Sequence, residues 1–445
     1  MNKNLLKFIG IVIITLVFMY GFSASYTSDS VDNISYVIAL AIDENEEEGE
    51  NNLQVTFEFM DTSSFSEQGS SSESSGTIID TVNATSITSA INLLNAYIGK
   101  EVNLSHCKVV VFSDKIASKG IYAEVSELMN NIQVRPSTNL IICKGRALDY
   151  VQSSSSQLEK ILTKYYDVFP NSSEYTGYTS NIMIGEFYNY LTTKECGNLA
   201  ILGGLNKTIS NQSSEESSDK QSSDQEGESS SSGSSKSSSE ESETKPDSNA
   251  NISQIIAGNA PILGERGTEN IGLAVMKDGV YLGNLTAIDT LCHTLISGEV
   301  NSFLLTINNT EIYENYLDIP LFENNSPKVT VEIDGDTPVI SIDIKLIGRI
   351  NGIKDGINYS DESSDLDLDK ISKAVNKSIE GYLTTYLNKT TSEFKCDLDY
   401  FYNYAKRNFL TIADWKNYDW ENKYLNSKFN INVDSHIYYS LLNSD

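Results

Sequence analysis

Two aspartates stand where their carboxyl groups could do chemistry. Asp397 and Asp399 lie two residues apart in the stretch CDLDYF, directly before a helical pattern. Two carboxyl groups that converge on a bond in a cleft can act as general acid and general base. A carboxylate in this place can equally cap the following helix, because the first backbone N–H groups of a helix need acceptors. The pattern favours this second role, with Asp399 as the helix N-cap or first-turn charge.

Two pairs of neighbouring residues, His106-Cys107 and Cys292-His293, carry the side-chain types of a metal site. A zinc site needs further ligands at close spacing, which neither pair has in the sequence. Neighbours along a strand point to opposite faces, so His106 and Cys107 would not face one ion. We therefore expect buried thiols beside exposed histidines and no metal. His436 lies without a companion in a strand-like run.

The sequence lacks the common catalytic and cofactor-binding motifs. It has no Gly-x-Ser-x-Gly, His-Glu-x-x-His, Cys-x-x-Cys or phosphate-loop pattern. The acidic run 355–369 resembles a calcium loop in acidity alone, because it lacks the glycine and glutamate spacing. The cysteines are odd in number and far apart, at 107, 143, 196, 292 and 396, unlike a disulfide scaffold. We predict no catalytic, cofactor-binding or metal-ligating residues and no enzymatic activity.

Composition narrows the classes of partner. The 445 residues carry 32 Lys plus Arg against 61 Asp plus Glu, a net charge of −29. Such a balance disfavours nucleic acid and adsorption to anionic membranes by charge alone. The overall amino-acid composition also excludes collagen, coiled coils and polytopic membrane proteins. The length predicts two or three domains.

The N-terminal stretch 1–28 predicts a signal or anchor helix. Lys3 and Lys7 precede the uncharged run 8–22, and Asp29 and Asp32 follow it. Positive charge before the run and negative charge after it predict that the remaining chain is exported. The run fits a cleaved signal peptide, or, extended to residue 28, an uncleaved membrane anchor. We favour the anchor.

Apolar patterns divide the rest of the chain into two ordered regions. Residues 29–205 alternate strands with helices, with a possible sub-boundary near residue 150. Residues 206–251 form a Ser/Glu-rich insertion that we expect to be disordered, because 211–250 contain no Ile, Leu, Val or aromatic residue. Residues 252–445 predict a second α+β region.

Further elements predicted in these regions set the fold class. The N-terminal strands lie at 31–42, 53–60, 107–112, 140–144 and 199–205, and the helices at 85–95, 116–129, 158–166 and 182–191. After the insertion we expect a hairpin at 271–282, a helix at 286–296, strands at 303–307, 328–333, 339–350 and 429–442, and a long helix at 368–387. The sequence thus predicts α+β domains with mixed, largely antiparallel sheets flanked by helices.

Five segments resemble the motifs of a known family, in order: 35–43 (SYVIALAID), 104–121 (LSHCKVVVFSDKIASKGI), 134–147 (VRPSTNLIICKGRA), 272–299 (GLAVMKDGVYLGNLTAIDTLCHTLISGE) and 396–424 (CDLDYFYNYAKRNFLTIADWKNYDWENKY). They resemble the Ger(x)C, or GerAC-type, family of spore germination proteins, the C subunits of nutrient germinant receptors. The resemblance spans about residues 31–445.

The resemblance implies a non-enzymatic subunit at the outer face of the spore inner membrane, assembled with integral-membrane A and B subunits. Some features depart from the family pattern. The cysteine that is usually lipid-modified is missing at 23–25, so the apolar helix would have to provide the anchor. The tryptophan that often opens the mature sequence is missing too, and Tyr402 stands near a position where a small residue is common. The Ser-rich insertion is also atypical.

Two other classes stay open from the residues. A membrane-anchored extracellular solute-binding protein would need a cleft between two lobes with convergent polar groups. A cell-wall hydrolase would depend on Asp397 or Asp399. The sequence leaves open which nutrient is sensed and whether this subunit contacts it.

Overall fold

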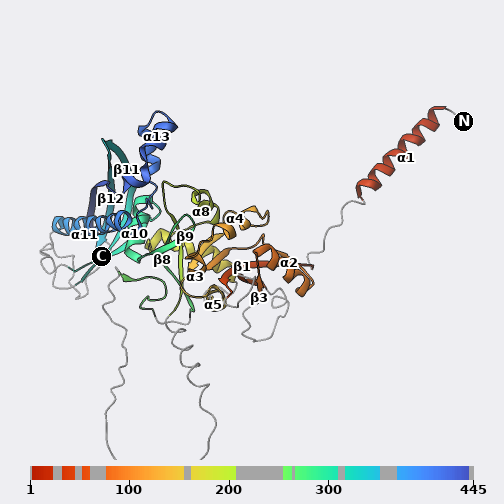
Figure 1. The fold of residues 1–445 in the computed structure, drawn as a ribbon, viewed down its shortest axis with the longest axis horizontal. Coiled ribbons are helices and arrows are strands. Elements are labelled where there is room, and N and C mark those ends of the chain that lie inside the picture. The colour runs from red at the N-terminus through yellow and green to blue at the C-terminus, as the bar shows by residue number, and fades with distance from the viewer. Residues whose placement is uncertain are drawn as a thin grey trace, which may run out of the picture.

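Two mixed β-sheets with flanking helices form the body of the molecule, as expected (Figure 1). The computed structural model describes residues 3–23, 33–45, 53–60, 77–154, 162–206, 254–262, 266–308, 316–350 and 368–439. Within the N-terminal helix it describes the side chains of residues 9–19 only. Of the predicted disordered insertion 206–251, residues 207–251 lie outside the described residues, as do residues 355–367 of the acidic run 355–369.

The larger sheet has the strand order β3-β2-β1-β5-β6-β7-β8-β9, and β4 also pairs with β1. The strands β1, β5, β6 and β7 run parallel, and antiparallel strands extend the sheet on both sides. The strands are β1 (Ile34–Glu44), β2 (Leu53–Met60), β3 (Thr77–Ala84), β4 (Glu101–Asn103), β5 (Val109–Ser113), β6 (Asn139–Cys143), β7 (Asn198–Leu205), β8 (Thr268–Lys277) and β9 (Val280–Leu285).

Helices cover both faces of this sheet. In β1, Leu40 and Ile42 pack into one hydrophobic cluster, while Ala39 and Ala41 pack into the other. This explains why the parallel strands read as continuous apolar runs. One face packs against α2 (Ile87–Ile98), α3 (Asp114–Ala117), α4 (Tyr122–Asn130) and α8 (Ile184–Tyr190), and the other against α5 (Ala147–Ser153), α6 (Leu162–Val168) and α10 (Ala287–Ser297). Two further short helices are η3 (Phe169–Ser172) and α7 (Ser173–Thr176).

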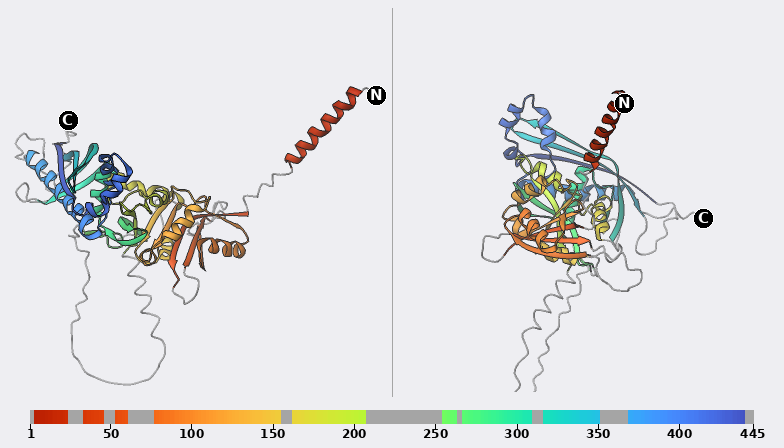
Figure 2. Two further views of the ribbon diagram at one scale, coloured as in Figure 1. Left: turned by 45° about the horizontal axis from the view of Figure 1, so that its top comes forward. Right: turned by 90° about the vertical axis from the view of Figure 1, so that its right-hand side faces the viewer.

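The smaller sheet has the order β10-β11-β12-β13 and lies at the other end of the molecule from β3 (Figure 2). Alternating positions of β12 are buried, which is typical of a sheet with one covered face. The long helix α11 covers that face with its apolar stripe, including Ile371, Val375 and Leu383. The elements are β10 (Ser302–Asn308), β11 (Tyr316–Asp334), β12 (Thr337–Ile350), α11 (Leu368–Lys389), η6 (Thr390–Phe394), α12 (Tyr402–Ala405), η7 (Lys406–Asn408), α13 (Ile412–Tyr418), α14 (Trp420–Tyr424) and β13 (Lys428–Tyr439).

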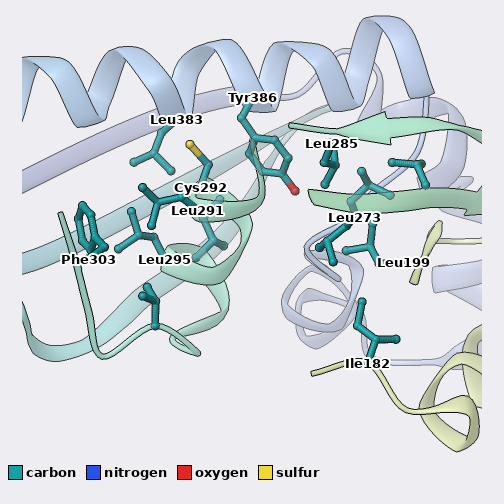
Figure 3. Packing of buried hydrophobic residues seen from close by; sticks show 14 of the residues in the cluster. Ile182, Leu199, Leu273, Leu285, Leu291, Cys292, Leu295, Phe303, Leu383 and Tyr386 are labelled. Atoms are coloured by element: carbon teal, nitrogen blue, oxygen red, sulfur yellow. The ribbon is translucent and has the colours of Figure 1, made fainter. Parts of the chain in front are cut away.

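One continuous core joins the two sheets. Helix α10 is buried on nearly every side and lies between them, so that Leu291 and Leu295 contribute to the same cluster as Leu273 of the large sheet and Leu383 of α11 (Figure 3). The space between the sheets is therefore filled by apolar side chains.

The first two strands after the insertion, β8 and β9, belong to the large sheet. Although residues 252–445 were expected to form the second region, β8 pairs with β7, and Leu205 lies opposite Thr268. The insertion therefore connects two neighbouring antiparallel strands. Sequence patterns had not predicted β3, β4 or α5, and the predicted helix at 116–129 is divided into α3 and α4 at Gly120, whose φ of 106° is unfavourable for other residues.

The N-terminal helix is α1 (Lys3–Ser23). Over the residues that the structure describes, none of the helices combines the length and hydropathy of a membrane span.

Candidate functional site

Asp397 caps backbone groups instead of forming a catalytic pair. Its side chain is 1% exposed, and its carboxylate accepts hydrogen bonds from Phe401 N (3.1 Å) and Tyr402 N (2.8 Å) at the start of α12. The indole Nε1 of Trp420 donates to Asp397 Oδ2 at 3.2 Å. The cap was expected at Asp399, so that assignment was wrong by two residues. Asp397 therefore connects the start of α12 with α14 through these hydrogen bonds.

Asp399 instead faces a histidine and a tyrosine. His293 Nδ1 and Tyr386 Oη lie 2.8 and 3.0 Å from Asp399 Oδ1. His293 is 4% exposed, which corrects the expectation of an exposed histidine beside Cys292. The physical reason is that α10 is a central helix buried all round, so adjacent Cys292 and His293 are both inside. We call Asp397, Asp399, His293, Tyr386 and Trp420 the junction cluster.

Electrostatics in the junction cluster follow from burial. Burial raises the pKa of Asp397 to about 7, against the opposing hydrogen bonds from Tyr402 and Phe401. Burial alone would lower the pKa of His293, but the Asp399 carboxylate outweighs it and the pKa is raised. The pair is therefore suited to an ionic hydrogen bond enclosed in the core.

The junction cluster holds the C-terminal block against the large sheet. Gly197 N donates to the backbone oxygen of Asp397 at 3.0 Å, at the point where β7 begins. The rings of Tyr190 and Tyr400 stack with their centroids 4.4 Å apart. The two aspartates therefore stabilise an internal junction.

The remaining candidate ligands do not converge. All five cysteines are buried and free, and burial raises the pKa of Cys107 and Cys396 to about 12. His106 is exposed and packs edge-on against Tyr36, while Cys107 is buried, as expected. His436 is exposed on β13. Within the described residues, no three His, Cys, Asp or Glu side chains gather as metal ligands.

A cleft that the sequence patterns had not indicated opens where β1 begins. It has a volume of about 770 Å³. We call it the β1 cleft. Its apolar lining is Ile34, Ile38, Phe59, Met60, Ile78 and Ile98, and its polar lining is Ser35, Tyr36, Asp80, Lys100, His106, Lys108, Thr163 and Asp167. Periodicity could not reveal it, since the lining comes from three strands, two helices and the loops between them.

One ion pair crosses the polar side of the β1 cleft. Lys108 Nζ lies 2.8 Å from Asp167 Oδ1, and the two side chains are 28% and 52% exposed. A smaller hollow of about 220 Å³ shares Lys108 and Asp167 and adds Arg135 to the lining. The β1 cleft thus combines an apolar wall with charged groups that solvent can reach.

Comparisons with known proteins were made for the whole chain. The model of the spore germination protein N-terminal domain matches residues 28–203, and that of the spore germination B3/GerAC-like C-terminal domain matches residues 271–440. No significant match was found among curated protein sequences. The solved structure of the GerBC protein is similar at 14% identity and a TM-score of 0.48, covering 89% of this chain and 96% of that one. The chain therefore belongs to the GerAC-like family of spore germination proteins and is a germinant-receptor subunit of the C type, not an enzyme.

Proposed function

We propose that this subunit is anchored by α1 at the outer face of the spore inner membrane, where it binds the integral-membrane A and B subunits of the receptor. It supports the assembly or signalling of the complex that triggers germination. The charge order around the apolar run 8–22 supports the orientation. Family membership supports the receptor context.

The observation that carries the subunit contact is an exposed apolar tip between η7 and α13. Leu410 is 99% exposed and Ile412 is 71% exposed. The tip is held in place because Thr411 caps α13 through Asp414 N at 3.1 Å. Phe409 packs on Trp415, with ring centroids 5.4 Å apart. Exposed aliphatic side chains on a fixed backbone are typical of a protein interface.

Lys406 and Arg407, both exposed, directly precede this tip in a strongly acidic chain. We therefore assign the tip to an acidic, partly apolar surface on a membrane subunit. The alternative of a solute-binding protein requires a cleft between two lobes. It receives less support, because apolar side chains fill the space between the two sheets.

Co-purification tests this proposal. A full-length chain tagged at its C-terminus is extracted from spore inner membranes in mild detergent, and the proteins that accompany it are identified. We expect a polytopic transporter-like protein and a second membrane subunit. A chain recovered alone, and released without detergent, would overturn both the anchor and the receptor complex.

A double variant locates the contact. Leu410→Ser with Ile412→Ser should lower the recovery of the membrane subunits at least tenfold without changing the fold, because both side chains face solvent. Ile132→Ser is the matched control, since Ile132 is 100% exposed on a different loop. Equal recovery with the double variant, or a loss with Ile132→Ser alone, would assign the contact to another surface.

A further inference from the structure

The charged lining of the β1 cleft is more basic than the chain as a whole. It is lined by two lysines, Lys100 and Lys108, and by His106. Two carboxylates, those of Asp80 and Asp167, also line it. Arg135 adds a third cation in the adjoining hollow. The cleft itself therefore has two cations and two carboxylates, and the cleft and the hollow together have three cations and two carboxylates. In the whole chain, by contrast, acidic residues outnumber basic ones by 61 to 32.

The apolar wall of the cleft is formed by four isoleucines together with Phe59 and Met60. Phe59 and Met60 end β2, and Ile78 lies near the start of the neighbouring strand β3. Ile78 is 52% exposed although it belongs to the cleft wall. Such a wall buries hydrocarbon, at about 25 cal/mol for each Å² removed from water. A volume of about 770 Å³ lies within the usual range for small-ligand sites.

The cleft also lies a short tether away from α1. That helix ends at Ser23, and β1 begins at Ile34, whose side chain lines the cleft. Eleven residues span at most about 40 Å when fully extended. If α1 is in the bilayer, as proposed above, the cleft is held within this distance of the membrane surface.

From this arrangement we infer that the β1 cleft binds an anionic acyl amphiphile, with its hydrocarbon chain against Phe59, Met60 and Ile78 and its anionic head at Lys100 and Lys108. The ion pair between Lys108 and Asp167 supplies a cation that a head group can share or take over. The acyl chain can come from a free fatty acid or from a membrane phospholipid. Binding of a membrane phospholipid rests on the proposed anchoring by α1, whereas binding of a free fatty acid does not.

Photolabelling of the full-length protein tests the inference. One arm adds a diazirine-bearing fatty acid to the protein in mild detergent. The other arm uses vesicles that contain phosphatidylglycerol with the same diazirine acyl chain. We expect labelled peptides to contain Phe59, Met60 or Ile78 in at least one arm. Labelling by the fatty acid alone identifies a soluble amphiphile as the ligand, and labelling in vesicles identifies a membrane lipid.

Variants make the test specific. Ile78→Asp places a charge on the apolar wall at a half-exposed position and should reduce labelling at least fivefold. Ile132→Asp, at a fully exposed site elsewhere, should leave labelling unchanged. Lys100→Glu should reduce labelling by the fatty acid but not by the matching diazirine alcohol, which carries no charge. Labelling that is spread over the whole surface, or that persists in Ile78→Asp, would overturn the inference whether or not the chain proves to be anchored.

Discussion

The junction cluster and the β1 cleft both gather charged side chains, but they differ in what the protein does with them. At the junction cluster, Asp397 and Asp399 are enclosed. Backbone N–H groups and an indole donate to both oxygens of Asp397, and an imidazole and a phenol contact Oδ1 of Asp399. At the β1 cleft, Lys108 and Asp167 meet each other and remain open to solvent. The first arrangement joins two sheets, while the second leaves charge available to a ligand.

This difference teaches that carboxylates spaced as if for catalysis can be internal connectors. The free energy of a buried polar group depends on whether it is fully hydrogen-bonded. Substitutions at the junction cluster should therefore change stability, and substitutions at the cleft should change binding. Both Trp residues are buried in the C-terminal block. Trp420 donates to Asp397, and Trp415 packs on Trp420, so their fluorescence reports unfolding of that block.

The largest effect is expected for Asp397→Ala. The change leaves two backbone N–H groups and the Trp420 indole without their acceptor in the core. We expect a loss of about 3–5 kcal/mol in the free energy of unfolding, since an unpaired buried donor costs about 1–3 kcal/mol. Urea unfolding of the full chain, followed by tryptophan fluorescence, measures it. Asp414→Asn, at the exposed start of α13, is the matched control and should cost under about 1 kcal/mol. A small loss for Asp397→Ala would contradict the connecting role.

Asp399→Asn should cost about 2–4 kcal/mol at pH 6 and less once the pH exceeds the raised pKa of His293. The raised pKa of His293 means that its stabilising contribution is complete below its unfolded value of about 6.5 and is lost as pH rises through the folded value. The difference between the variant and the parent protein should shrink over that range in the same urea titration. A difference that stays constant from pH 6 up to the highest pH at which the parent protein remains folded would show that the ionised imidazole is not part of the pair.

Glu58→Gln sharpens the comparison, because at pH 8 this substitution at a buried carboxyl group should raise the free energy of unfolding and not lower it. Glu58 is buried, accepts from Tyr166 Oη at 3.1 Å, and has a pKa raised to about 7 by burial. Its contribution to stability is therefore complete below the unfolded value near 4.5 and is lost as pH rises through 7. The neutral glutamine should make the protein more stable at pH 8, by about 1–3 kcal/mol, and leave it nearly unchanged at pH 4. Lower stability at pH 8 would mean that the carboxylate is needed there.

Lys108→Met should change stability by under about 1 kcal/mol, because ion pairs open to solvent contribute little. It should nevertheless weaken labelling of the β1 cleft by the anionic probe. Asp167→Asn keeps the cation and serves as the control. If Lys108→Met lowered the free energy of unfolding by several kcal/mol, the charges of the cleft would be structural like those of the junction cluster, and the proposed difference between the two regions would be wrong.

The smallest effect is expected when residues 207–250 are replaced by a linker of about six Gly and Ser residues. The free energy of unfolding should change by under about 1 kcal/mol, because loop length enters only logarithmically. Removal of 254–262 is the contrasting deletion. Ala257 N donates to Ile271 O at 2.8 Å, and Gly258 N donates to Glu269 Oε2 at 2.8 Å, so that loss should be clearly larger. Equal losses would show that the insertion itself stabilises the sheet.

Local patterns in the sequence predicted much of the fold. The alternation in β2 gives the bounds Leu53–Met60, and the apolar stripe of α11 is found where it was expected. By contrast, β3 carries Asp80, Thr81 and Asn83 beside its apolar residues, and its regularity comes from pairing with β2.

The candidate site was harder to predict, because its partners are distant in the sequence. His293 and Asp399 are separated by 106 residues, and α10 is buried on both the Cys292 and the His293 side. Helical periodicity identifies one buried face and gives no sign of a helix that is enclosed all round. The β1 cleft depends on how strands, helices and loops end beside one another, which no local pattern specifies.

The pairing of β7 with β8 across the insertion also affects the order of events during synthesis. When the ribosome has released β7, its outer edge has no partner until at least the residues of β8 at 268–277 follow, some 60 residues later. An unpaired strand edge is a template for association with other chains. The nascent chain therefore passes through an interval in which seven of the nine strands of its larger sheet have been made while the edge of β7 is exposed, and a chaperone that shields β7 would act at that time.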